Sequence, residues 1–262
     1  MNVWTQKSVL LANQDDYLDQ LYKVYPMPNN LNRTITDDVK IQLDNYMNNK
    51  NNKELIELLL KQEVFPLKDS YVAYLKRDKA SIGRNPQTIN RLAGMVCDLG
   101  YGEVLKLITR PIETNRQIGP MFKQWLEKNV LGIDVCTDEK EFMSTNENLV
   151  FIGSDAKMKQ VAADNFGYTH DKGLDFICRM NGKIVLGETK FLTDFGGHQN
   201  AQFADAMSVI SSKFKPTKYE VIPVAILDGV LYIKSENKLY NAIKKDVNVF
   251  SALFLRDYLY SL

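Results

Sequence analysis

The amino-acid sequence predicts an α/β protein, α+β overall, in which a mixed sheet flanked by helices follows a mainly helical N-terminal region. Two observations predict this class. Segments up to about residue 129 carry the apolar periodicity of helices and contain no convincing hairpin. In the second half, the tight-turn pair Asn181-Gly182 joins two strand-like segments, and a helical segment then separates them from another apolar strand. The sheet is therefore expected in the C-terminal half.

The first region is expected to cover residues 1–140, and the sheet domain residues 141–262. Between the helical segments of the first region lie polar turns that are too short to be an interdomain linker. The division near residues 130–145 should therefore be one of architecture. The segments with helical periodicity are residues 14–25, 37–49, 52–62, 70–77, 86–99 and 121–128.

The sheet domain should begin with a short buried strand at residues 149–153. Ser154 is a favourable N-cap for the helix that follows, and Gly167 is a favourable residue to end it. The two strands of the hairpin then occupy residues 172–180 and 183–191.

A helix at residues 199–214 should connect the hairpin to an apolar strand at residues 219–227. A helix between two strands usually makes a right-handed crossover, so this strand should run parallel to its neighbour. Pro223 indicates a bulge or an edge within it. Asp228-Gly229 should turn the chain into a strand at residues 230–233, and helices are expected at residues 238–245 and 250–262.

The two-residue turn determines which residues of the hairpin face each other. Met180 should pair with Lys183, and the same index sum places Asp175 opposite Glu188. Opposed residues have Cβ atoms about 4.5–5.5 Å apart, so two carboxylates there repel each other unless a cation neutralises them. The sequence therefore predicts a divalent cation beside this pair.

Lys190 should share the face of the two acids, because side chains alternate along a strand, whereas Thr189 can offer only its backbone carbonyl. Oxygen ligands with few dedicated protein contacts suit Mg²⁺, which keeps waters and accepts phosphate oxygens. One or two Mg²⁺ ions held by Asp175, Glu188 and the Thr189 carbonyl would suit phosphodiester hydrolysis, with Lys190 orienting the water or neutralising the developing charge. The alternative is an ordinary charge cluster on a surface hairpin.

This pattern resembles the PD-(D/E)XK nuclease superfamily, in which an acid at the start of one strand precedes (D/E)-x-K on the next. Asp175, Glu188 and Lys190 match these positions, while Leu174 stands in place of the expected proline. The resemblance covers roughly the C-terminal half. It implies a core of helix, three strands, helix and strand, and within the superfamily the chain looks most like a type II restriction endonuclease. An acid of the upstream helix, Asp155 or Asp164, would complete a second metal site.

That resemblance implies a site-specific enzyme that cuts double-stranded DNA, with a cognate DNA methyltransferase in the same host. A homodimer is expected, because two active sites related by a two-fold axis cut both strands of a palindrome most simply. The helical region would then recognise DNA, mediate dimerisation, or both. Two other functions stay open: a repair or recombination nuclease with the same core, and a non-catalytic DNA-binding protein.

Candidate DNA contacts fall in three places. Residues 68–91 hold six basic residues against two acids in a chain whose net charge is +1, and affinity for DNA depends on such local cations. Residues 113–122 hold side chains that can read base edges. The segment after the catalytic strand lies within reach of the cleaved phosphate. A solvated helix face and a structural turn remain alternatives for the first two. The candidate residues are Arg84, Asn115, Arg116, Gln117, Lys172, His198, Gln199, Asn200 and Gln202.

Composition limits the remaining classes. At 262 residues and 45% hydrophobic, the chain can bury a full core. No apolar run approaches the roughly 20 residues that cross a bilayer, and the N-terminus lacks signal-peptide features, so we expect a cytoplasmic protein without a membrane partner. Cys97, Cys136 and Cys178 are scattered and give no zinc pattern. The sequence has no glycine-rich phosphate loop that would support an ATP-driven function.

Overall fold

The computed structural model describes residues 1–27, 32–113, 116–235, 237–245 and 247–262, apart from the side chain of His198. These residues form two compact units. Unit 1 comprises Met1–Met27 and Thr114–Leu262, and unit 2 comprises Pro28–Glu113. Unit 2 is thus inserted into the sequence of unit 1. Within the described part of the chain, no helix is both long enough and apolar enough to cross a membrane.

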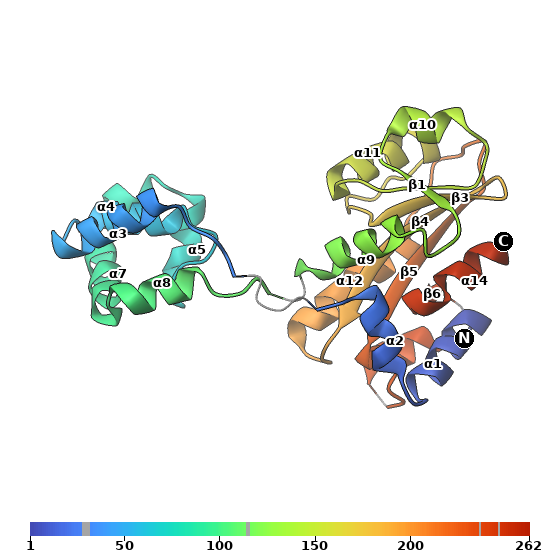
Figure 1. Ribbon diagram of the computed structural model, residues 1–262, viewed down its shortest axis with the longest axis horizontal. Coiled ribbons are helices and arrows are strands. Elements are labelled where there is room, and N and C mark those ends of the chain that lie inside the picture. The colour runs from blue at the N-terminus through green and yellow to red at the C-terminus, as the bar shows by residue number, and fades with distance from the viewer. Residues whose placement is uncertain (28–31, 114–115, 236, 246) are drawn as a thin grey trace. The chain divides into compact units, whose positions relative to one another are not determined.

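Unit 1 is built on a six-stranded mixed sheet whose strand order, β1-β2-β3-β4-β5-β6, follows the chain (Figure 1). β1 and β2 are parallel, β3 is antiparallel to both β2 and β4, and β4, β5 and β6 are parallel. The strands are β1 (Asp134–Cys136), β2 (Leu149–Phe151), β3 (Phe176–Met180), β4 (Lys183–Leu192), β5 (Val221–Gly229) and β6 (Val249–Phe250).

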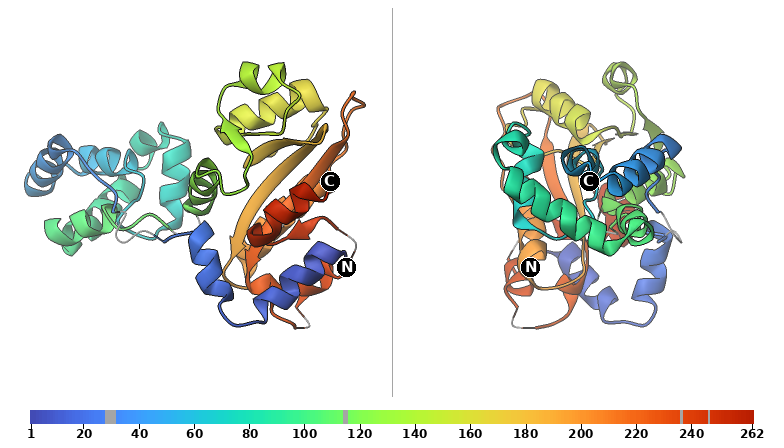
Figure 2. Two further views of the ribbon diagram at one scale, coloured as in Figure 1. Left: turned by 45° about the vertical axis from the view of Figure 1, so that its right-hand side comes forward. Right: turned by 90° about the vertical axis from the view of Figure 1, so that its left-hand side faces the viewer.

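Helices pack on both sides of this sheet (Figure 2). Along β3, Phe176, Cys178 and Met180 join one apolar cluster and Ile177 joins the other, as the alternation of a strand requires. The helices of unit 1 are α1 (Val3–Ala12), α2 (Tyr17–Val24), α9 (Ile118–Glu127), α10 (Glu139–Ser144), α11 (Asp155–Phe166), α12 (Gly197–Ile210), α13 (Lys238–Ile243) and α14 (Leu255–Tyr260), with 3₁₀ turns η2 (Val230–Tyr232) and η3 (Ala252–Phe254).

In unit 2 the described residues form helices around an apolar cluster to which α3, α4, α7 and α8 contribute Leu43, Ile56, Leu92 and Val104. The helices are α3 (Asp37–Asn48), α4 (Asn52–Leu60), α5 (Ser70–Arg77), α6 (Ser81–Arg84), α7 (Pro86–Leu99) and α8 (Tyr101–Ile108). Thr36 and Asp69 cap α3 and α5 through their side chains, which satisfies N–H groups that a helix start leaves unpaired.

The two chain ends of unit 2 are held together by Arg33, which is buried. Its guanidinium donates to the carbonyls of Arg110 and Pro111 at 2.9 and 2.8 Å and forms ion pairs with Glu63 and Glu113. These contacts join the first described residues of the unit to its last ones.

The turn of the hairpin and the elements beside it form as the sequence predicts, although the first strand begins at Phe176 instead of residue 172. Met180 pairs with Lys183, and Asn181 and Gly182 both have positive φ, at 49° and 80°, as a type I′ turn requires. Ser154 caps α11, and Gly167 ends it in the left-handed conformation. β5 runs parallel to β4, as the crossover rule predicts.

Other elements differ from the prediction. The sequence pattern did not reveal α1, α8, β1 or β6. The expected strand at residues 230–233 is a 3₁₀ turn, because β5 continues through Asp228 to Gly229 instead of turning there. The expected C-terminal helix begins as β6 and becomes helical in two short steps.

The expected boundary lay between residues 140 and 141, whereas the compact units divide after Met27 and after Glu113. The N-terminal segment joins unit 1 because the hydroxyls of Tyr17 and Tyr25 donate to Asp228 at 3.3 and 2.9 Å. Residues beyond 114 join it because Phe122 of α9 packs on Phe176 and β1 pairs with β2. These contacts link positions far apart in the sequence, so no local pattern reveals them.

Candidate active site

Asp175 lies where the regular pairing of the hairpin ends. The last pair of the ladder is Phe176 with Gly187, and the N–H of Asp175 donates to the Gly187 carbonyl at 2.8 Å. Asp175 and Phe176 thus both stand opposite Gly187, as in a β-bulge. The register predicted from the turn holds up to this pair, and the expected direct pairing of Asp175 with Glu188 is displaced at the next step.

Gly187 is needed at this position because the ring of Phe176 fills the space beside it. A Cβ added to Gly187 would lie 1.8 Å from Cε1 of that ring, which no side chain can tolerate. The glycine therefore allows the ring to lie against β4 immediately before Glu188.

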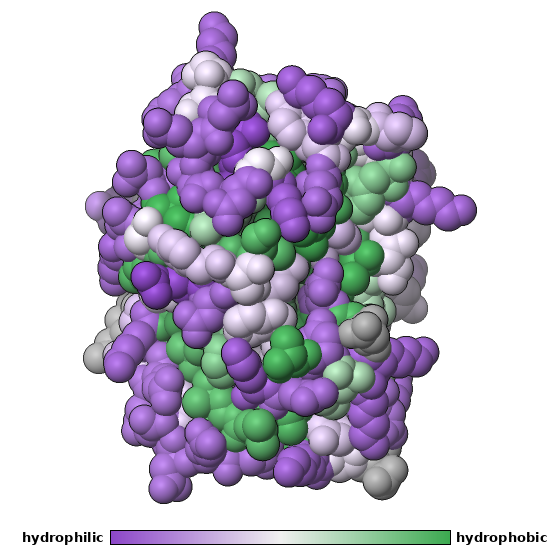
Figure 3. Space-filling model, turned by 90° about the vertical axis from the view of Figure 1, so that its right-hand side faces the viewer, coloured by the Kyte–Doolittle hydropathy of each residue, from purple (hydrophilic) through white to green (hydrophobic). Residues whose placement is uncertain are grey.

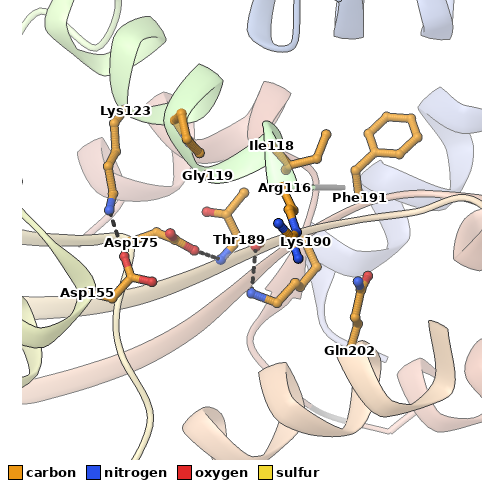
Figure 4. Close-up of a pocket in the computed structure, with 11 residues that line it drawn as sticks. Arg116, Ile118, Gly119, Lys123, Asp155, Asp175, Thr189, Lys190, Phe191 and Gln202 are labelled. Carbon is orange, nitrogen blue, oxygen red and sulfur yellow. Dashed lines mark hydrogen bonds and ion pairs between the residues drawn. The ribbon is translucent and has the colours of Figure 1, made fainter. Parts of the chain in front are cut away.

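The Asp175 carboxylate is held by backbone. Its Oδ2 accepts the N–H of Thr189 at 2.7 Å, and the residue is 6% exposed. On the other side it meets the first turn of α9, where a Cβ on Gly119 would lie 3.2 Å from Oδ1. Figure 4 shows the carboxylate between these two elements. The bulge therefore turns the aspartate toward the backbone of β4.

Lys190 brings a positive charge to the same backbone. Its Nζ forms an ion pair with Glu188 and donates to the Thr189 carbonyl at 3.2 Å. Thr189 thus supplies an N–H to Asp175 and a carbonyl to Lys190 (Figure 4). The structure therefore brings Asp175, Glu188 and Lys190 together around one peptide segment.

Burial shapes the protonation of all three groups. Burial raises the pKa of Asp175, against the lowering effect of Lys190 and of the Thr189 N–H. Burial, followed by the charge of Asp175, raises the pKa of Glu188 to about 7. Burial alone would lower the pKa of Lys190, but the charges of Glu188 and Asp175 outweigh it and raise that pKa. The site therefore holds two carboxylates that are costly to ionise together and one ammonium that keeps its proton.

A pocket of about 440 Å³ opens beside these groups in unit 1. Asp175, Thr189 and Lys190 line it together with Lys123 of α9 and Asp155 of α11. Lys123 donates to Asp155 and to the Gly153 carbonyl, both at 2.9 Å (Figure 4). Lys123 and Asp155 thus add a cation and a second acid to the pocket, whereas Glu188 is not among its lining residues.

The sequence did not single out Lys123 as a functional residue. The only signal was a lysine next to Phe122 in an otherwise apolar stretch of helix. Asp155 was considered as a ligand of a second metal, and it lines the pocket, whereas Asp164 accepts from Gln160 along α11 and is not among the lining residues. Gly173 permits the approach of Asp155, since a Cβ there would lie 2.5 Å from the Asp155 Cβ.

The structure distributes the predicted DNA-binding residues unevenly. Arg116 and Gln202 line the pocket. Gln117 directly precedes α9, and the expected turn at Gly119 is the first turn of that helix. Asn115 lies outside the described residues. Arg84 belongs to unit 2, where it forms an ion pair with Asp78.

The candidates near α12 have different surroundings. Lys172 forms an ion pair with Asp205 at 2.9 Å. Gln199 of α12 is buried and accepts the Thr193 N–H at 3.2 Å, so its carboxamide is engaged by the segment that precedes the helix. Asn200 has a buried Oδ1 without a hydrogen-bond partner among the described atoms. His198 lies in α12, and its side chain is outside the described part.

The donor atoms at the site fit a hard divalent cation. Asp175, Glu188 and the Thr189 carbonyl offer only oxygen, and the pKa of each carboxyl is raised, so positive charge beside them favours their ionised forms. Within the described residues there is no group of three or more His, Cys, Asp or Glu side chains that could hold a metal. Such a site suits an ion that keeps several waters rather than one enclosed by protein ligands.

Comparison with known proteins identifies the family. No curated protein and no solved structure matches the chain significantly. The family model described as the Tsp45I type II restriction enzyme matches residues 2–262, which include both units. Members of this family cut DNA, and type II restriction enzymes generally use divalent metal ions. The chain therefore belongs to the Tsp45I type II restriction enzyme family and is a site-specific deoxyribonuclease with a PD-(D/E)XK-like fold.

Proposed function

We propose that this restriction endonuclease hydrolyses phosphodiester bonds of double-stranded DNA in a Mg²⁺-dependent, sequence-specific reaction carried by Asp175, Glu188 and Lys190. One observation carries the proposal: beside a pocket, the buried Asp175 carboxylate accepts the Thr189 N–H, and the Lys190 ammonium, paired with the half-buried Glu188 carboxylate, donates to the Thr189 carbonyl. Removing charged groups from water costs folding free energy, and such groups cluster at functional sites. Their presence here therefore favours a catalytic role over a structural one.

Asp175, Glu188 and the Thr189 carbonyl would hold Mg²⁺, one or two ions per site. Bound there, the ion would lower the pKa of a coordinated water and polarise a phosphate oxygen. The Thr189 N–H keeps the Asp175 carboxylate oriented, since it donates to Oδ2. The bulge at Asp175 thus serves to aim one ligand.

Lys190 keeps its proton because Glu188 and Asp175 raise its pKa. It therefore acts as a donor and a positive charge: it orients the attacking water or neutralises charge on the phosphate in the transition state. Lys123 and Arg116 line the same pocket and add positive charge toward a DNA phosphate. Asp155 holds Lys123 in place through their ion pair.

Sequence recognition is proposed for polar residues around the pocket. Arg116 and Gln202 line it, and arginine and glutamine pair with guanine and adenine through two hydrogen bonds. Asn115, Gln117, His198 and Asn200 remain proposals of the same kind. Lys172, Gln199 and Arg84 would have to exchange the partners described above before they contacted DNA.

We further propose a homodimer, and a cognate DNA methyltransferase in the same host. α1 and α2 expose large apolar side chains, including Leu10 and Leu18 at 58% and 68% exposure, that a second copy could cover. Figure 3 shows one face of the molecule, where hydrophobic side chains gather in the lower half among charged ones. Sedimentation of the wild type against Leu10→Glu/Leu18→Glu tests whether such side chains hold a dimer.

The test of the function is a digest of plasmid DNA. Wild-type protein with Mg²⁺ should give discrete fragments, and EDTA should abolish them. Lys190→Ala should still bind DNA but should not cut it, whereas Lys213→Ala, an exposed lysine of the same unit, should cut as the wild type does. A smear instead of discrete fragments would favour a repair nuclease. Full cutting by Lys190→Ala would refute the assignment of the site.

A further inference from the structure

One face of unit 2 combines exposed aromatic rings with unpaired cations. We call it the α5 face: Tyr71, Tyr74 and Arg77, which follow one another at a spacing of three residues on α5, together with Lys68 and Lys79, the lysines that flank the helix in the chain. Tyr71 and Tyr74 are 62% and 60% exposed, and all three basic residues are exposed. Large exposed aromatic side chains grouped with cations are typical of a surface that meets a partner.

The cations of the α5 face differ from others in the unit. Lys68, Arg77 and Lys79 have no ion pair or hydrogen bond from their side chains among the described residues. Lys40 and Lys106, on α3 and α8, are paired with Asp37 and Glu103 at 2.7 and 3.4 Å. The charge on the α5 face is therefore not compensated locally.

Beside the two tyrosines lies a shallow pocket of about 350 Å³, to which α7 adds Asn85 and Thr88. Arg91, also of α7, lies 5.6 Å from the centre of the Tyr71 ring and is held by Asp69 at 2.8 Å. The wall of the pocket thus offers flat rings together with amide and hydroxyl groups. Side chains of these types contact the sugars, phosphates and base edges of nucleic acid.

The chain joins the two units next to the active site. Tyr25, just before unit 2 begins, packs edge-on against Phe191 with ring centres 5.6 Å apart, and Arg116, just after it ends, lines the active-site pocket. Phe191 lines the same pocket. The chain therefore leaves and re-enters unit 1 beside residues that line the pocket.

We propose that the α5 face is a second DNA-binding surface, in which Lys68, Arg77 and Lys79 contact phosphates of the duplex while Tyr71, Tyr74 and Asn85 lie along its sugars and base edges. The proposal rests on the proposed function, since it takes the substrate to be duplex DNA. The positive charge of the α5 face indicates which kind of partner binds there. A polyanion complements three uncompensated cations, whereas an apolar partner would leave them buried and unpaired.

The test measures binding without cleavage. Full-length protein in EDTA is titrated against a labelled duplex of arbitrary sequence at several salt concentrations, with fluorescence anisotropy as the readout. Each lost phosphate contact reduces the slope of log affinity against log salt by about 1, so Arg77→Ala/Lys79→Ala should reduce it by about 2. Lys40→Ala/Lys106→Ala removes the same charge from the same unit and should leave the slope unchanged.

Three further variants test whether a loss of binding comes from lost contacts with DNA, from misfolding or from a change in net charge. The charge-conserving Arg77→Lys/Lys79→Arg should keep the wild-type slope. Tyr74→Ala should weaken binding several-fold, whereas Tyr22→Ala, an equally exposed tyrosine on α2, should not. An unchanged slope in Arg77→Ala/Lys79→Ala, or an equal fall in both alanine doubles, would overturn the proposal. Failure of the wild type to cut DNA with Mg²⁺ would instead overturn the proposed function, and the binding comparison in EDTA would still be readable.

Discussion

The two units place their charges in opposite ways. Unit 1 buries Asp175, Arg179 and Asp228 in and beside its sheet, with exposures of 6%, 1% and 0%. Among the described residues of unit 2, the only buried charged side chain is that of Arg33, where the two chain ends meet. The rest of that unit encloses an apolar helical core, and its other charged side chains are exposed or half-buried.

This difference separates two chemical tasks. A charge removed from water costs free energy unless it is paired, but in a buried site its interaction with a reacting group is stronger. Unit 1 accepts that cost at Asp175 and Glu188, where one ammonium faces two carboxylates. Exposed charges cost little and can exchange solvent ions for DNA phosphates. Catalysis thus suits the first unit and the capture of DNA the second.

The largest effect should come from Glu188→Gln, which removes a half-buried carboxyl group from the proposed site of unit 1. Cleavage should fall by about 10³-fold, the scale of losing one preorganised group at a reacting centre. Stability in EDTA at neutral pH should rise, because burial and Asp175 disfavour the ionised form of Glu188. Single-turnover cleavage and thermal unfolding measure the two effects.

The matched control is Glu220→Gln, an exposed acid next to β5 that pairs with Lys183. It should change neither the single-turnover cleavage rate nor the thermal stability. A Glu188→Gln enzyme that is active, or that is much less stable than the wild type, would contradict the contrast drawn between the units.

Asp228 tests a buried acid of unit 1 that is fully paired and lies in no proposed site. It accepts from Tyr17, Tyr25 and Ser251 and from the Ala252 N–H. Asp228→Ala should destabilise the protein by about 3 kcal/mol, because these donors lose their acceptor. Denaturant unfolding measures the loss. Asp228→Asn keeps one acceptor oxygen and should lose clearly less, and equal losses would mean that the hydrogen bonds are not the cause.

Arg33 tests the buried charge of unit 2. Arg33→Ala should destabilise that unit by about 2 kcal/mol, since two carbonyls and two carboxylates lose their partner. Hydrogen exchange should show lost protection in α3 to α8 and unchanged protection in the sheet. Arg84→Ala breaks an exposed pair with Asp78 and should cost at most about 0.5 kcal/mol. Equal losses across both units would show that they unfold together.

The smallest effect concerns pH. The folded-state pKa of Glu188, about 7, lies above its ordinary value of 4.5, so the folded protein binds more protons between these values. Stability should therefore fall as pH rises from about 4.5 to about 7. The measurement is the difference in unfolding free energy between wild type and Glu188→Gln across this window without metal. A difference that is constant, or that changes with the opposite sign, would contradict the raised pKa.

The parts of unit 1 that could be predicted were those with local chemistry. Asn181-Gly182 determines a hairpin by itself, and counting forward from it located Glu188 and Lys190 on β4. The bulge at Asp175 could not be foreseen, because it depends on the Phe176 ring against Gly187 and on the Thr189 N–H that the carboxylate accepts. Short strands such as β1 and β6 carry too few residues for a period.

Contacts between residues far apart in the sequence were the other feature that could not be predicted. Asp228-Gly229 has the composition of a turn, yet Asp228 is buried because hydroxyls from α2 and from Ser251 converge on it. Lys123 reaches the pocket from a helix whose neighbouring residues are mostly apolar. In both cases the contacting residue lies far away in the sequence, so the apolar alternation of strands and the periodicity of helices do not predict the contact.

The ends of unit 2 have a consequence for how such a chain can change over time. Asn32 pairs with Pro111 as an antiparallel bridge, and the Arg33 N–H donates to the Thr109 carbonyl at 3.2 Å. A segment whose two ends run side by side can be lengthened, shortened or exchanged without pulling apart the scaffold that carries it. Residues 32–111 are therefore a natural cassette: ancestors could have acquired or replaced it in one recombination step, and a protein engineer could graft another in its place.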